Sequence, residues 1–108
     1  MAAEFKVHYT DKSEEDLDEI LNYISVDLSN PIAAMSFLDE FEKTIDRARL
    51  FPESGSPVNN PYVKTEGLRK LYVKNYTVFY FPDMINESIV ILRIIYSHRD
   101  IASIINSL

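Results

Sequence analysis

The stretch from Leu68 to Asp100 most constrains how this chain can fold. It contains three consecutive runs that are dense in β-branched and aromatic residues, and the two breaks between them are too short to hold a helix. Such runs are typical of strands, and short breaks favour pairing between neighbours in the sequence. The stretch therefore predicts an antiparallel meander of three strands.

The first two runs predict a hairpin. In Leu68–Val73 one side of the pleat would carry Arg69, Leu71 and Val73 and the other Leu68, Lys70 and Tyr72, which we interpret as a half-buried strand. The pair Lys74 and Asn75 follows, and Asn tolerates the positive φ that two-residue turns require. We expect the chain to return as a strand over Tyr76–Phe81 and expect Pro82 to close that strand.

The third run, Ile89–Tyr96, is apolar at nearly every position. A strand with this composition must be covered on both faces, so we expect it to be the interior strand. Arg93 is the exception within this run. A buried unpaired charge is costly, so Arg93 must meet a carboxylate, a carbonyl or water, unless it contacts a target directly.

The N-terminal half predicts one strand followed by two helices. Met1–Thr10 alternates in the manner of a strand. Ser13 is the expected cap of the first helix, with Asp16 at the capping-box position, and Asn30-Pro31 is the expected start of the second. Helical spacing predicts two apolar stripes, formed by Leu17, Ile20, Leu21, Ile24 and Leu28 in the first helix and by Ala34, Phe37, Leu38, Phe41, Ile45 and Ala48 in the second.

The remaining segments are a loop and a tail. Glu53–Gly67 is a loop of a length that is often functional. Arg99–Leu108 has helical spacing and predicts a short helix or an extended segment. The fold class is α+β: an N-terminal strand, an antiparallel two-helix hairpin packed on an antiparallel β-sheet, and a short C-terminal helix.

Composition sets further bounds. With 108 residues and 46% hydrophobic content, residues 1–108 should form a single domain. No window resembles a signal peptide or a membrane span, so we expect a cytoplasmic protein that does not bind membranes. The chain has no Cys, which fits a reducing compartment and excludes thiolate catalysis.

Charge is divided unevenly along the chain. Residues 1–63 hold five Lys/Arg and thirteen Asp/Glu, a net −8, whereas residues 64–108 hold six and four, a net +2. Nucleic-acid binding depends on neutralising phosphates with Lys and Arg. A chain with a net charge of −6 is therefore not expected to bind DNA directly on its own.

Several segments in a fixed order resemble one protein family over nearly the whole chain. The sequence resembles the RelE/ParE superfamily of toxins from type II toxin–antitoxin systems, and is closer to the ParE (plasmid stabilisation) members. The resemblance is carried by Asp16–Ile20, Tyr23-Ile24, Ala33-Ala34, Phe37-Leu38, Leu50–Gly55, Gly67–Leu71, Tyr76–Tyr80 and Ile91–Asp100. The family fold that it implies is a helical hairpin on an antiparallel sheet.

The resemblance implies two alternative activities. RelE-like members cleave mRNA on the ribosome, and the matching residues here are Arg69, Lys70, His98 and Arg99. Two other positions depart from that pattern, because Thr77 stands where an arginine is expected and the catalytic tyrosine would fall near Ile105. These departures favour the ParE-like activity, inhibition of DNA gyrase through protein–protein contact. An inactive member that only binds an antitoxin is a third alternative.

The resemblance also implies partners and contact residues. Expected partners are a cognate antitoxin and DNA gyrase, or the ribosome and mRNA in the alternative, with a homodimer or a toxin–antitoxin heterotetramer as the assembly. No cofactor is expected. The acidic run Glu14–Asp16 suits a helix N-terminus better than a metal site, so no metal site is expected either. Candidate contacts for the target or the antitoxin are Arg69, Tyr72, Arg93, His98 and Arg99.

Overall fold

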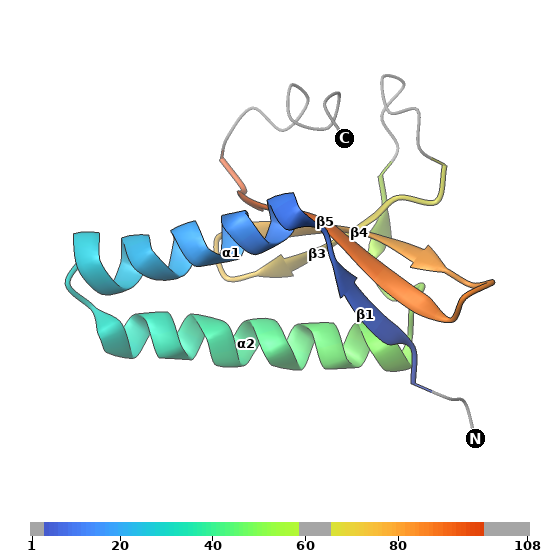
Figure 1. The fold of residues 1–108 in the computed structure, drawn as a ribbon, viewed down its shortest axis with the longest axis horizontal. Coiled ribbons are helices and arrows are strands. Elements are labelled where there is room, and N and C mark those ends of the chain that lie inside the picture. The colour runs from blue at the N-terminus through green and yellow to red at the C-terminus, as the bar shows by residue number, and fades with distance from the viewer. Residues whose placement is uncertain (1–3, 59–65, 99–108) are drawn as a thin grey trace.

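A computed structural model describes residues 4–58 and 66–98. In this part of the chain, a helical pair covers one face of a five-stranded sheet whose strand order is β1-β5-β4-β3-β2 (Figure 1). The strands are β1 (Lys6–Tyr9), β2 (Ser56–Pro57), β3 (Arg69–Val73), β4 (Tyr76–Asp83) and β5 (Ser88–Tyr96). The predicted α+β class is confirmed.

The predicted meander forms as β3, β4 and β5, and β5 is an interior strand between β1 and β4. One pairing differs from the expectation of an antiparallel sheet, because β1 runs parallel to β5 with Lys6 opposite Ser88 and Tyr9 opposite Ile91. The sheet is therefore mixed. Side-chain alternation is the same for both strand directions, so the sequence pattern did not determine this pairing.

Three details of the meander differ from the prediction. The positive φ in the β3–β4 turn is at Lys74 (53°), not at Asn75. Pro82 does not close β4, which runs on to Asp83 and pairs Pro82 with Ile89. The pairing of β4 with β3 ends at Tyr80, so beyond it β4 has a neighbouring strand on one side only. Pro82, which has no backbone N–H to donate, is tolerated in this position. A β-bulge near Phe79 and Tyr80 was not predicted.

The first helix of the pair begins three residues earlier than predicted, and the second begins where predicted. Helix α1 spans Asp11–Asn22, and the Thr10 side chain caps it by accepting a hydrogen bond from the Ser13 N–H at 3.1 Å. The prediction that Ser13 is the cap was wrong, because β1 ends at Tyr9 and the helix follows at once. The prediction for the second helix is confirmed: α2 spans Pro31–Leu50 and Asn30 caps it.

Between these helices lies a π-helical turn, η1, over Tyr23–Asp27. Such single turns shift the phase of a helix and occur often at functional sites. Here Leu28, expected on the buried stripe, is 55% exposed. The first helix therefore buries only part of its predicted stripe.

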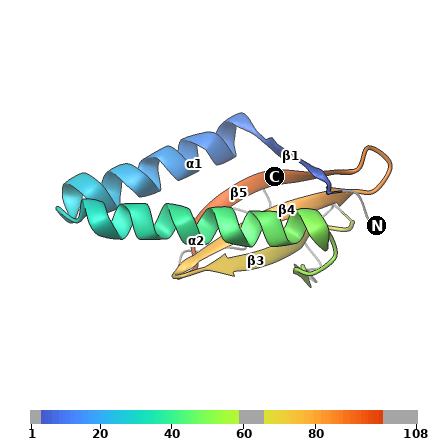
Figure 2. The ribbon, with the colours of Figure 1, turned by 90° about the horizontal axis from the view of Figure 1, so that it is seen from below.

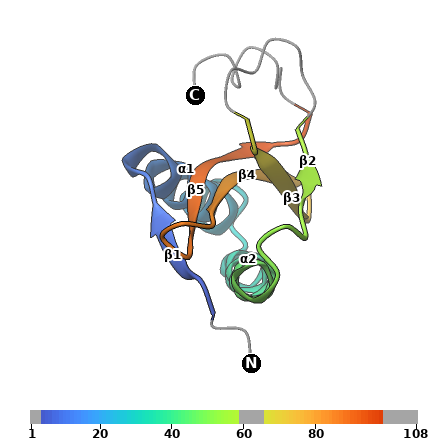
Figure 3. The ribbon, with the colours of Figure 1, turned by 90° about the vertical axis from the view of Figure 1, so that its right-hand side faces the viewer.

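The main core lies between the helices and the sheet (Figures 2 and 3). Its fully buried aromatic residues are Phe37 and Phe41 from α2 and Tyr80 from β4. A second, smaller cluster of Leu68, Phe79 and Ile95 lies on the other face. The predicted C-terminal helix and Arg99 lie outside the described residues.

Candidate functional site

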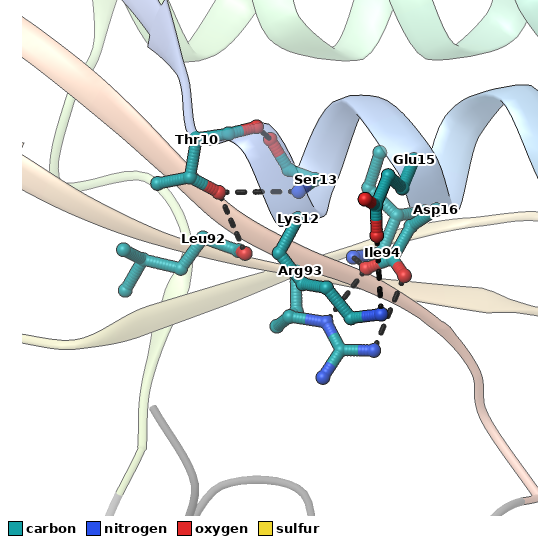
Figure 4. A network of polar contacts seen from close by, with 8 residues as sticks. All are labelled: Thr10, Lys12, Ser13, Glu15, Asp16, Leu92, Arg93 and Ile94. Carbon is teal, nitrogen blue, oxygen red and sulfur yellow. Dashed lines mark hydrogen bonds and ion pairs between the residues drawn. The ribbon is translucent and has the colours of Figure 1, made fainter.

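The seam between α1 and β5 contains a buried ion pair. Arg93 donates to both carboxylate oxygens of Asp16, from Nε to Oδ2 at 2.7 Å and from Nη2 to Oδ1 at 3.1 Å (Figure 4). The Ile94 N–H also donates to Asp16 Oδ2, at 3.0 Å. Asp16 is therefore not a capping-box residue. Because α1 starts at Asp11, Asp16 lies beyond the free N–H groups of the first turn and faces β5.

This seam closes a sheet edge that β1 leaves open. The pairing of β1 with β5 ends at Ile91. Beyond it, the Thr10 N–H donates to the Ile91 carbonyl and the Thr10 hydroxyl donates to the Leu92 carbonyl, both at 3.1 Å. With the bond from Ile94 to Asp16, the start of α1 takes the place of a neighbouring strand.

Arg93 is consequently engaged within the protein. Its side chain is 13% exposed, and that of Asp16 is 7% exposed. The sequence required Arg93 to find a compensating partner, and Asp16 supplies it. The guanidinium edge that binds Asp16 is closed to a target molecule.

Arg69 is also engaged, on β3, which is separated from β5 by β4. It donates from Nη1 to the Glu53 carbonyl at 3.0 Å and to the Gly55 carbonyl at 2.7 Å. Tyr80 acts on the same segment, since its hydroxyl donates to the Pro52 carbonyl at 2.7 Å and accepts from the Gly55 N–H at 2.9 Å. We call Pro52, Gly55, Arg69 and Tyr80 the clamp, because together they fasten the chain after α2 to the sheet.

Of the other described candidates, Tyr72 and His98 are exposed and Lys70 is half-buried. Tyr72 is 58% exposed, and the Lys70 ammonium lies 5.9 Å from the centre of its ring. His98 is exposed and lies beside Tyr96, with 5.2 Å between ring centres. Lys70, Tyr72 and His98 are therefore the predicted residues whose side chains are accessible to a partner.

The register separates the described members of the predicted ribonuclease set. Arg69 pairs with Tyr80, which pairs with Ile91, whereas Val73 pairs with Tyr76, which pairs with Tyr96. These two levels differ by four residues of β3, or about 13 Å along a strand. His98 follows Tyr96, so it lies at the far end of the sheet from Arg69. Arg69 and Lys70 are neighbours in the chain, but the structure does not bring His98 to them.

A feature that the sequence did not reveal is an apolar trough near the helical turn. Two adjoining cavities of about 790 and 130 Å³ share Tyr23, Tyr76 and Tyr96 in their walls. We call them together the tyrosine trough. The larger cavity is also lined by Ile24, Leu28, Ala33, Phe37, Lys74 and Asn75, and the smaller by Asp16, Glu19, Ile20 and Ile94.

Aromatic packing builds the floor of the trough. Phe37 packs edge-on against Tyr76 at 5.2 Å between ring centres, and Tyr76 packs edge-on against Tyr96 at 5.7 Å. Burial raises the pKa of Tyr76 above 10.0, and the neighbouring Tyr23 and Tyr96 raise it further. Tyr76 is therefore a neutral hydroxyl at physiological pH, able to donate a hydrogen bond.

Exposed apolar side chains continue beyond the trough on the helical turn. Tyr23, Val26 and Leu28 are 48%, 63% and 55% exposed, and Ile32 and Met35 on α2 are 80% and 74% exposed. A group of this kind is typical of a protein-binding surface. Of these five residues only Leu28 belongs to a predicted stripe, so the two stripes did not reveal this surface.

Among residues 4–58 and 66–98, no group of three or more His, Cys, Asp or Glu side chains is placed to hold a metal ion. Within the same ranges, no helix is long and apolar enough to cross a membrane. The trough offers apolar walls, tyrosine hydroxyls and a few charges.

Comparisons with known proteins place the chain in a family. Residues 7–101 match the model of the ParE toxin of the type II toxin–antitoxin system, parDE. The chain belongs to the ParE toxin family. No curated protein sequence is significantly similar to it.

Two solved structures share the fold of this ParE-family toxin. One is from the chromosomal ParDE toxin–antitoxin system of P. aeruginosa, with 20% identity, a TM-score of 0.66, and coverage of 85% of this chain and 95% of that chain. The other is from the RelBE2 toxin–antitoxin complex of Mycobacterium tuberculosis, with 18% identity, a TM-score of 0.59, and coverage of 87% and 99%. Both were solved as parts of toxin–antitoxin systems.

Proposed function

We propose that this ParE-family toxin arrests bacterial growth in the cytoplasm by binding DNA gyrase, and that a cognate antitoxin neutralises it. The observation that carries the proposal is that two of the predicted basic residues bind groups within the protein itself. Arg69 is bound to two backbone carbonyls and Arg93 to a buried carboxylate. An endoribonuclease needs cations directed at the phosphate in the transition state, whereas Arg69, a member of the predicted ribonuclease set, is directed into the protein.

The arrangement of accessible groups also supports binding over catalysis. Lys70 lies on β3 beside Arg69, whereas His98 lies beyond the end of β5, so among the described residues His98 is not gathered with the other two. Exposed aromatic and basic side chains of this kind are common at protein interfaces. We assign Tyr72 and His98 to the contact with gyrase.

The antitoxin contact is assigned to the tyrosine trough. Flexible partners often insert apolar side chains into a preformed groove beside amphipathic helices. The trough provides such a groove, and Val26, Ile32 and Met35 extend the apolar surface around it. The toxin–antitoxin systems of the two structural neighbours are in line with such a partner.

A supercoiling assay with purified gyrase tests the first half of the proposal. We expect the wild-type toxin to inhibit supercoiling and the antitoxin to reverse the inhibition. The Tyr72→Ala and His98→Ala variants should inhibit less, whereas Met84→Ala is a control at the β4–β5 turn with similar exposure, 53% against 58% for Tyr72. Unimpaired supercoiling in the presence of folded toxin would contradict the proposal.

Mapping of transcript ends after induction separates the alternatives. Gyrase inhibition predicts a DNA damage response without cuts linked to codons. Cuts within translated mRNA would instead establish the ribonuclease alternative, with Lys70 and His98 as its accessible described residues. Expression without growth arrest would identify an inactive member that only binds antitoxin.

A further inference from the structure

The two ends of the tyrosine trough carry opposite charges. Among its lining residues, Asp16, Glu19 and Lys74 are charged. Asp16 is neutralised by Arg93, and no cation of residues 4–58 and 66–98 pairs with Glu19, which is therefore the anion at the α1 end. Lys74, in the β3–β4 turn, is the cation at the other end, where its ammonium donates to the Ser36 hydroxyl at 3.2 Å.

The part of the trough between Glu19 and Lys74 can contact both the apolar side chains and the backbone of a bound peptide segment. Tyr76 and Tyr96 present ring faces and hydroxyl groups, and within the described residues no hydrogen bond fixes these two hydroxyls. A phenol of this kind can donate to a backbone carbonyl of a bound segment. The rings supply apolar contact area at the same time.

The β5 edge adds backbone groups to the same wall. The Ile94 N–H points to Asp16 on the side of the trough, whereas the Ser97 N–H points to Asn75 on the opposite side. Because backbone direction alternates along a strand, the N–H and C=O of Tyr96 lie on the same edge as those of Ile94. Asp16 already binds the Ile94 N–H, so an extended segment in the trough would pair with the backbone groups of Tyr96.

We propose that the trough binds an extended apolar segment of the antitoxin in one direction, with a basic residue at Glu19 and an acidic residue at Lys74, and that these two charges select the cognate antitoxin. This inference rests on the proposed neutralisation by an antitoxin. Opposite charges at the two ends fix direction because the reversed segment would place like charges together.

Affinity measurements on the complex test the inference. The probe is the protein encoded by the adjacent gene, co-purified with the toxin and then titrated against each variant. We expect Lys74→Glu and Glu19→Lys each to raise the dissociation constant about tenfold. Matched controls make the same changes nearby: Lys70→Glu on β3 and Asp18→Lys on α1 should stay within about twofold. An antitoxin with its two charges exchanged should restore affinity for the double variant.

The outcomes separate this inference from the proposed function. If the wild-type toxin binds no adjacent antitoxin, the proposed neutralisation fails. If the wild type binds but the reversals at Lys74 and Glu19 behave like their controls, the charge selection is overturned and the neutralisation stands. If light scattering of the free toxin shows a dimer that Lys74→Glu dissociates, the trough belongs to a second copy of the chain and the inference is overturned.

Discussion

Tyr76 and Tyr80 pack against the same core from one strand, yet their hydroxyls have different surroundings. The Tyr80 side chain is fully buried, and its hydroxyl bonds Pro52 and Gly55 in the clamp. The Tyr76 side chain is half-buried and lines the tyrosine trough. The comparison teaches that position on a sheet face does not decide the role of a polar side chain. Satisfied buried polar groups hold the fold, and polar groups left accessible at an apolar surface are available for a partner.

The largest effect on stability should come from breaking the buried ion pair between Asp16 and Arg93. Like the clamp, this pair is a structural contact. We expect Asp16→Ala to lower the free energy of unfolding by about 3–5 kcal/mol, because Arg93 and the Ile94 N–H lose their partner in a buried setting. Chemical denaturation measures the change. The control is Glu15→Ala, which removes an exposed pair with Lys12 and should cost less than about 1 kcal/mol. Equal losses in the two variants would show that the seam does not hold the fold.

The second effect compares the two tyrosines directly. Tyr80→Phe should lower the free energy of unfolding by about 1–3 kcal/mol, because Gly55 N–H and the Pro52 carbonyl lose their buried partner. Tyr76→Phe should change it by less than about 0.5 kcal/mol. Thermal and urea unfolding of both variants provide the test, and similar losses would remove the distinction between clamp and trough.

These predictions use contacts that the sequence alone could not supply. Apolar spacing and strand-like runs were enough to predict both helices, the β3–β5 meander and the interior position of β5. The partner of Arg93 was not predictable, because Asp16 lies 77 residues earlier and appeared to be a capping residue. The trough was missed for another reason: the π-helical turn breaks the regular spacing and exposes Leu28, which a continuous stripe would bury.

A third effect appears at alkaline pH. Burial raises the pKa of Tyr80 above 10.0 in the folded protein. The unfolded chain then loses this proton first, so the contribution of the neutral hydroxyl is present below pH 10.0 and is lost as the pH rises toward the folded pKa. We expect wild-type stability to fall above pH 10.0 more steeply than that of Tyr80→Phe. Parallel pH profiles from urea unfolding at pH 9–11 would contradict this assignment.

The smallest effect on stability should occur on the helical turn. Val26→Ser and Ile32→Ser replace side chains that are 63% and 80% exposed. We expect each to change the free energy of unfolding by less than about 0.5 kcal/mol, while weakening antitoxin binding. Unfolding and binding measured on the same preparations give the comparison. A large loss of stability with unchanged binding would reverse the roles assigned to the two regions.

The central claim is that the clamp holds the fold and the tyrosine trough binds the antitoxin. Amide hydrogen exchange of the free toxin and of its antitoxin complex tests this claim most directly. The account predicts that protection increases on binding along η1, in the β3–β4 turn and at the end of β5. It also predicts that the amide of Gly55 in the clamp is already protected in the free toxin and gains little. Protection gained mainly around Gly55 and Arg69, with η1 and Tyr96 unchanged, would contradict it.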